Sequence, residues 1–438
     1  MSMKTLINEV AGLSPYKWYG KVSQVVGLMI ESKGPQVSIG ELCYITVGKN
    51  QQRKIMAEVV GFKDENVLLM PYDAIHDISP GSLVESTKNP LRVKIGTSLI
   101  GNVIDGIGRP LHDPELFNGL QPFPTENDPP NPLQRPRIEE PLSLGIRAVD
   151  SLFTVGKGQR LGIFAGSGVG KSTMMAMMAK NSDADVNVIA LIGERGREVR
   201  DFIERDLGEE GLKKTIVVVA TSDQPALMRI KGAMTATAIA EYFRDLGLNV
   251  TLMMDSVTRV AMAQREIGLA VGEPPTTKGY TPSVFALLPR LLERSGTNER
   301  GTITAFYTVL VDGDDLSEPI ADAVRGILDG HLVLDRKLAN KGQFPAINVL
   351  KSVSRVMKDI VCADHLEAAD TMRHFLSVYE DSEDLITIGA YKRGSNKEVD
   401  RAIQLNPELI QFLKQGNHER ITLEDSVGQL IDLFRKGG

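Results

Sequence analysis

The sequence predicts an α/β protein with a mostly parallel central sheet, preceded by a small β-barrel and followed by a helical domain. Three observations predict this fold. Short apolar runs between turn residues fill the first part of the chain, longer apolar runs alternate with helix-like segments in the middle, and apolar residues recur every three or four positions toward the end. With 438 residues, the chain is long enough for two or three buried cores.

The first part, residues 1–87, is expected to hold an N-terminal segment and the barrel. In residues 1–15 the apolar side chains have roughly helical spacing, which fits a short amphipathic helix or a frayed terminus. The apolar runs that follow are short and separated by turn residues, which is typical of a small barrel or sandwich. These runs are residues 25–30, 42–47, 55–60 and 67–70.

The middle part, residues 88–357, is expected to be the α/β domain. It opens with a proline-rich crossing at 123–136, which excludes a helix or a central strand and predicts an ordered linker. The apolar runs after it are near-continuous, as in parallel strands that are buried on both faces. We expect strands at residues 161–165, 188–192, 216–220, 250–254 and 303–311, with helices at 171–180 and 233–245.

The last part, residues 358–438, is expected to be a helical domain, because apolar residues there recur at three- to four-residue steps and strand patterns fade. No repeat of 20 to 50 residues and no low-complexity tract interrupts the chain.

Composition and charge exclude some classes of protein. The chain is 42% apolar and carries 50 Lys and Arg against 56 Asp and Glu, a net charge of -6, which argues against duplex nucleic acid as the main partner. No apolar stretch reaches the ~18 residues that a bilayer-spanning helix needs. Cys43 and Cys362 are too far apart in sequence for a CxxC site and too few for a disulfide framework, so a reducing cytosol is expected.

The strongest motif lies between the predicted strand 161–165 and the predicted helix 171–180. It fits the phosphate-loop pattern G-x-x-x-x-G-K-[ST], except that Ala165 stands at the first glycine position. Lys171 would reach the β- and γ-phosphates of ATP, and the Ser172 hydroxyl would bind Mg²⁺. An ordinary glycine-rich turn is the alternative. The predicted phosphate-binding residues are Gly166, Ser167, Gly168, Val169, Gly170, Lys171, Ser172 and Thr173.

Two acidic residues follow apolar strands and complete the predicted site. Asp255 ends the run 250–254, where a carboxylate could hold the metal's water shell, although an Asp in this position is also a common helix N-cap. Glu194 follows the run 188–192, where a carboxylate could align or deprotonate the attacking water. A salt-bridged turn is the alternative for the segment around Glu194.

Two further residues are candidates in the segment 344–355. Arg355 follows a short serine-containing stretch and could stabilise charge on a transferred phosphoryl group, often in trans, whereas a solvated surface arginine is the simpler reading. Phe344 could stack on an adenine ring or pack in the core.

Together these motifs resemble one family. The phosphate loop, the segment 193–198, the strand ending at Asp255 and the segment 345–354 occur in the order found in the α/β subunits of rotary ATPases. The segments 40–43, 69–72, 164–172 and 289–294 are similar instead to the type III secretion ATPases, and most of all to their flagellar export branch of a Gram-positive type. The resemblance covers nearly the whole chain.

The resemblance implies a P-loop (RecA-like) ATPase that forms a homohexameric ring. By this resemblance, Lys171 and Ser172 would bind the phosphates and Mg²⁺, and Glu194 would be the catalytic carboxylate. Arg355 would be an arginine finger from the neighbouring subunit, and Phe344 the adenine platform. The second aromatic wall of the synthase β subunit falls near residues 416–417, where no aromatic stands. Supporting roles go to Arg195, Asp255 and Arg259.

The same resemblance implies partners and a location. The ring would work in the cytoplasm, peripherally at the membrane base of the flagellar export apparatus, with a central stalk protein, a regulatory stator-like protein, the export gate, and export substrates with their chaperones. A virulence-type secretion ATPase and a synthase β-like subunit are alternative readings. A hexameric nucleic-acid motor is a third, against which the acidic balance and the near-neutral N-terminal region count.

Overall fold

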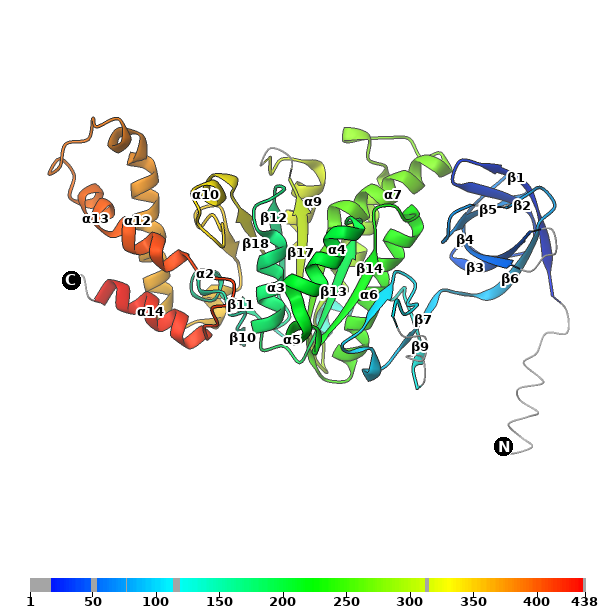
Figure 1. Ribbon diagram of the computed structural model, residues 1–438, viewed down its shortest axis with the longest axis horizontal. Helices are drawn as coiled ribbons and strands as arrows, with labels where there is room; N and C mark the ends of the chain where they lie inside the picture. The colour runs from blue at the N-terminus through cyan, green and yellow to red at the C-terminus, as the bar shows by residue number, and fades with distance from the viewer. Residues whose placement is uncertain (1–16, 49–52, 76, 113–118, 312–314, 436–438) are drawn as a thin grey trace.

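The computed structural model describes residues 17–48, 53–75, 77–112, 119–311 and 315–435. Figure 1 shows the N-terminal barrel at one end, a central sheet covered by helices, and C-terminal helices at the other end. This arrangement confirms the predicted fold class. The amphipathic segment predicted at residues 1–15 lies outside the described residues.

The N-terminal strands form a closed six-stranded antiparallel barrel in the order β1-β2-β5-β4-β3-β6. The predicted runs 42–47, 55–60 and 67–70 lie within β3, β4 and β5, whereas the run 25–30 is not one strand, because Gly27 and Leu28 form the turn of the β1–β2 hairpin. Strand β6 is half polar and was not predicted; it passes through the division expected after residue 87. The bounds are β1 Tyr19–Val26, β2 Met29–Lys33, β3 Glu41–Val47, β4 Arg53–Lys63, β5 Asn66–Pro71 and β6 Leu83–Pro90.

The central sheet has the strand order β19-β18-β12-β17-β15-β13-β14-β8, and β16 pairs with β17 beside this path. All pairs from β18 to β8 are parallel. The five predicted strands are confirmed as β12 Arg160–Ala165, β13 Val186–Ile192, β14 Thr215–Ala220, β15 Asn249–Asp255 and β17 Thr302–Leu310. Within this sheet, the strands that were not predicted are β8 Val103–Asp105, β16 Gly296–Thr297, β18 Gly330–Leu334 and β19 Val353–Ser354.

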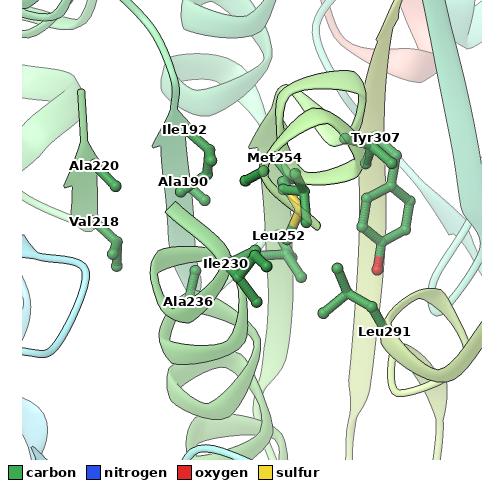
Figure 2. Packing of buried hydrophobic residues seen from close by; sticks show 14 of the residues in the cluster. Ala190, Ile192, Val218, Ala220, Ile230, Ala236, Leu252, Met254, Leu291 and Tyr307 are labelled. Atoms are coloured by element: carbon green, nitrogen blue, oxygen red, sulfur yellow. The ribbon is translucent and has the colours of Figure 1, made fainter. Parts of the chain in front are cut away.

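Side chains on the two faces of this sheet pack into two separate hydrophobic cores. On β13, Ala190 and Ile192 face the core under α6, while Ile189 and Leu191 face the core under α3. Figure 2 shows Ile230 and Ala236 of α6 against β13, β14 and β15. Burial on both faces is why these strands read as continuous apolar runs. The helices are α2 Arg147–Leu152, α3 Lys171–Asn181, α6 Ala226–Asp245, α7 Val257–Val271, α8 Pro282–Leu292 and α9 Pro319–Ile327.

A buried charge cluster ties the barrel to the central domain. The ammonium of Lys231 on α6 lies 2.9 Å from a carboxylate oxygen of Glu58 in the barrel and 2.5 Å from one of Glu126 in the proline-rich crossing. Tyr72 donates a hydrogen bond to Glu58. The crossing itself joins β9 Gln121–Pro124, which pairs with β7 Arg92–Ile95, to one 3₁₀ turn at Pro132–Gln134, in keeping with an ordered linker. Buried ions need such partners, so the cluster fixes the three segments together.

The C-terminal part is helical, as predicted. Helices α12 and α13 pack as a pair, and α14 packs against α2 of the central domain. In the part of the chain that the structure describes, every helix is too short or too polar to cross a lipid bilayer. The bounds are α11 Met357–Ile360, α12 Ala363–Thr387, α13 Lys397–Leu413 and α14 Leu423–Arg435.

Candidate functional site

A cleft of about 740 Å³ opens where β12, β13, β15 and β17 end. The carboxyl ends of parallel strands are where α/β proteins place their ligand sites. The phosphate-loop motif forms one wall, and the helix α4 Gly196–Asp201 with the following π-helical turn Phe202–Leu207 forms another. The predicted residues that line the cleft are Gly166, Ser167, Gly168, Gly170, Lys171, Ser172, Thr173, Glu194, Arg195, Asp255 and Arg259.

The phosphate loop joins β12 to α3. Gly170 is the N-cap of α3 and has a φ of 88°, a left-handed conformation that glycine adopts without strain. The first turn of an α-helix leaves backbone N–H groups free, which makes this end of α3 suited to phosphate oxygens. Val169, also predicted to bind phosphate, packs in the core and is not among the residues that line the cleft.

Three charged side chains meet at the base of the cleft. The ammonium of Lys171 contacts Oδ1 of Asp255 and lies 3.8 Å from Oε1 of Glu194. The buried hydroxyl of Thr308 on β17 donates a hydrogen bond of 2.8 Å to the same Asp255 oxygen. Asp255 therefore is not the helix N-cap that was its alternative reading; Ser256 caps α7. Thr308 was not predicted, because a threonine within a strand gives no functional signal.

Glu194 has the protonation behaviour of a base that works near neutral pH. Burial, with a further contribution from the charge of Asp255, raises the pKa of Glu194 to about 7, and Lys171 opposes this shift. A carboxyl with a pKa near the working pH can accept a proton from a water molecule and release it again. Its backbone carbonyl accepts a hydrogen bond from Ser222, which fixes the turn after β13.

Two arginines line the same cleft as Glu194. Arg259 on α7 packs against Gly193, where a Cβ would lie only 2.8 Å from the Cβ of Arg259. Its Nε is buried without a hydrogen-bond partner. Arg195 is exposed and pairs with Glu198 at 3.4 Å, so the salt-bridged turn that was the alternative reading is present beside the partly buried Glu194. Arg259 is the more restricted of the two cations.

The donor set fits one hard divalent cation. Ser172 and Asp255 offer a hydroxyl and a carboxylate on the cleft. The described residues contain no group of three or more His, Cys, Asp or Glu that could hold a metal alone. Mg²⁺ is commonly held in this way, by one or two protein oxygens together with substrate phosphates.

Phe344 lies at the edge of the phosphate loop. A Cβ on Gly170 would be 3.4 Å from the Phe344 ring, and the side chain is 42% exposed, so the alternative of core packing is wrong. The exposed residues Gly416 and Asn417, where the second aromatic wall is absent, follow Gln415, whose backbone N–H donates to the Phe344 carbonyl at 2.9 Å. An exposed ring beside a phosphate loop can receive a base.

Arg355 lies apart from its own cleft. In the sheet register Ala165, at the phosphate loop, pairs with Leu334 at the end of β18, whereas Ser354 pairs with Gly330 at its start. Arg355 is therefore near the opposite edge of the sheet, where it is exposed and its guanidinium is 3.4 Å from the Leu328 carbonyl. Within one chain the structure does not bring Arg355 together with the other predicted residues.

Comparison with known families gives matches over most of the chain. The profile of the ATP synthase alpha/beta family, nucleotide-binding domain, matches residues 145–354. The beta-barrel domain of the same family matches residues 22–88. The C-terminal domain of the T3SS EscN ATPase matches residues 361–432.

Individual relatives match nearly the whole chain. It is 68% identical over 433 residues to the flagellum-specific ATP synthase of Bacillus subtilis, covering 99% of both chains. It is 50% identical over 431 residues to the type 3 secretion system ATPase of Xanthomonas euvesicatoria, covering 98% of this chain and 97% of the relative. The assembled ATPase EscN of the enteropathogenic E. coli type III secretion system superposes with a TM-score of 0.88 at 43% identity, over 94% of this chain and 99% of EscN. EscN has also been solved in complex with its central stalk EscO.

Proposed function

This chain belongs to the ATP synthase α/β family, within its group of flagellar and type III secretion ATPases, and we propose that it hydrolyses ATP in a homohexameric ring to energise flagellar protein export. The observation that carries the proposal is the contact of Lys171 with Asp255 and Glu194 beneath a phosphate loop. The flagellar relative is 68% identical and the Xanthomonas secretion relative 50%, which favours flagellar over virulence export.

The nucleotide is held by the phosphate loop and Phe344. The glycines and the first turn of α3 offer N–H groups to the phosphates, and Lys171 pairs with their charge. Ser172 and Asp255 would hold Mg²⁺, which supplies charge neutralisation at the phosphates when bound. The exposed Phe344 ring receives the adenine. Because residues 416–417 provide no second ring, the base is held on one face.

Hydrolysis needs a base and a counter-charge for the transferred phosphoryl group. Glu194, whose pKa is near 7, accepts a proton from the attacking water. Arg259 and Arg195 lie beside it on the cleft and add positive charge. Lys171 leaves its carboxylate partners when it binds the phosphates, which frees Asp255 for the metal and Glu194 for the water.

The ring completes each site from two subunits. Arg355 is exposed and lies far from its own cleft, so it serves a neighbouring copy, and a head-to-tail contact between identical subunits repeats this pairing around a closed ring. The structure of assembled EscN supports such an arrangement for a relative. Identical subunits thus supply both Glu194 and Arg355. In a ring of two alternating kinds of subunit, one kind would supply the glutamate and the other the arginine.

The ring is further proposed to work in the cytoplasm at the membrane base of the flagellar export apparatus. The complex of EscN with its central stalk EscO supports a central stalk protein as a partner. A regulatory stator-like protein, the export gate, and export substrates with their chaperones are the other proposed partners.

Complementation tests this function directly. In a Bacillus subtilis strain lacking its flagellum-specific ATP synthase, we expect this chain to restore swimming, because the two proteins are 68% identical over nearly their full lengths. The Lys171→Ala variant should fail in swimming and in ATP hydrolysis, since it removes the phosphate-binding charge, and Lys180→Ala at the far end of α3 is the matched control. Hydrolysis by the purified chain without any recovery of motility would point instead to another export system.

The pKa of Glu194 predicts the pH dependence of catalysis. Because burial raises this pKa to about 7, the carboxyl is protonated and inactive as a base below that pH. The value of kcat/KM for ATP should therefore rise about tenfold per pH unit up to about pH 7 and then level off, as measured between about pH 5.5 and 8.5. A profile that stays flat down to the acid end would contradict the raised pKa of Glu194 in the working enzyme.

A further inference from the structure

Gln415 occupies a junction between the C-terminal helices and the nucleotide cleft. It follows α13, and its side chain is 5% exposed. The amide Oε1 accepts a hydrogen bond of 2.8 Å from the backbone N–H of Arg147, and Nε2 donates to the carbonyls of Gly145 at 2.8 Å and Glu419 at 3.1 Å. Every hydrogen-bonding atom of the side-chain amide therefore has a partner from the backbone.

The partners of Gln415 come from three separate parts of the chain. The backbone N–H of Gln415 donates to the carbonyl of Phe344, whose ring lies against Gly170 of the phosphate loop. Gly145 packs so closely on the last residue of α3 that a Cβ there would lie 2.4 Å from the Cβ of Asn181. The side chain of Gln415 thus fixes its own backbone to the chain before α2 and to the connection to α14, and that backbone in turn holds the carbonyl of Phe344.

Arg147 closes the same junction from the central domain. Its guanidinium donates to the carbonyls of Phe412 and Lys414, at 3.1 and 3.0 Å, and pairs with Glu419. These carbonyls end α13, where the helix leaves them without internal partners. The C-terminal helical domain is therefore anchored to the central domain beside Phe344 by hydrogen bonds.

We propose that Gln415 is a positioning residue for the nucleotide base: it holds Phe344 in place and thereby links the position of the C-terminal helices to the affinity of the cleft for adenine nucleotide. The inference rests on the proposed role of Phe344 in adenine binding. Gln415 is distant in sequence from the phosphate loop and acts on the base only, through Phe344. The phosphates are bound by other residues, so binding of a ligand without a base should not depend on Gln415.

Replacing Gln415 by methionine tests this link. Gln415→Met keeps the length of the side chain and removes the hydrogen bonds of the side-chain amide, so the backbone N–H that holds the Phe344 carbonyl is no longer fixed in place by them. Binding of ADP and of pyrophosphate, a probe that has no base, is measured by calorimetry on the full chain with Mg²⁺. We expect ADP affinity to fall about three- to tenfold, part of the stacking contribution of an aromatic ring, while pyrophosphate affinity stays at the wild-type value. Gln411→Met, an exposed position on α13, is the matched control and should leave both affinities unchanged.

Two further variants separate the possible outcomes. Phe344→Ala should lose about tenfold or more in ADP affinity; if it does not, the adenine role of Phe344 fails and the inference falls with it. If Phe344→Ala weakens ADP but Gln415→Met does not, Gln415 is not a positioning residue. Equal losses for ADP and pyrophosphate would mean general loosening of the cleft and would also overturn the proposal. Should Gln415→Met not fold, Gln415→Asn serves instead, because it keeps the amide but is one methylene too short to reach the same partners.

Discussion

Replacing Glu194 by glutamine should abolish ATP turnover and leave nucleotide binding intact. The substitution keeps the size of the side chain but removes the group that accepts the proton, and general-base catalysis is worth about 10²- to 10⁴-fold in rate. Binding should persist, because the phosphate loop and Phe344 are untouched. The ammonium of Lys171 also stays positively charged for the phosphates when one of its two neighbouring carboxylates is replaced by an amide. Steady-state hydrolysis and ADP calorimetry on the same sample measure the two effects.

Glu204→Gln provides the matched control for this variant. Glu204 is exposed on the π-helical turn after α4, pairs with Arg200 at 2.8 Å, and does not line the cleft. Its activity should equal that of the wild type. If Glu194→Gln hydrolyses ATP at the wild-type rate, Glu194 is not the base. If it loses nucleotide binding as well, its carboxylate is needed to build the cleft and the two roles cannot be separated by this variant.

Replacing Arg355 by alanine should lower turnover in assembled rings by about 10³-fold or more, the range found for arginines that act on a phosphoryl group in trans. The physical reason is the loss of a positive charge where negative charge develops in the transition state. Nucleotide affinity of the dissociated chain should not change, because Arg355 lies near the opposite edge of the sheet from the phosphate loop.

The effect of Arg355→Ala should depend on assembly. At protein concentrations where the chain is monomeric, variant and wild type should hydrolyse ATP at the same low rate, and the difference should appear only as rings form. Arg300→Ala, at an exposed arginine in the loop before β17, is the control and should assemble and turn over normally. Sizing by light scattering beside the rate measurement ensures that Arg355→Ala rings are compared with wild-type rings.

Local patterns predicted the parts of this fold that local forces determine. Strands buried on both faces must be apolar throughout, which made β12, β13, β14, β15 and β17 predictable, and the phosphate loop needs glycines at fixed spacing. The run 25–30 was taken as one segment because the residues on both sides of the hairpin turn are apolar and the turn at Gly27 and Leu28 carries no proline or charge. Strand β6, with a polar second half, gave no pattern at all.

Some residues of the candidate site could likewise be predicted from local sequence patterns, and others could not. Lys171, Glu194 and Asp255 each follow a recognisable strand, so their meeting at the carboxyl edge of the sheet could be predicted. Thr308 and Gln415 could not, because their roles arise from hydrogen bonds to residues more than fifty positions away, and neither residue type is unusual in its element. For Arg355 the sequence favoured a surface residue, and its exposure fits that reading as well as a role in a neighbouring subunit.

Mixing two inactive variants tests most directly the idea that each site is completed by a neighbouring copy. Glu194→Gln and Arg355→Ala subunits are combined in equal amounts and assembled, and ATP hydrolysis is measured. If Arg355 acts in trans, about a quarter of the interfaces in a randomly mixed ring join an intact Glu194 to an intact Arg355, and activity should reappear in that proportion. If mixed rings stay as inactive as either variant alone, the two residues do not meet across a subunit interface, and the proposed catalytic ring is wrong.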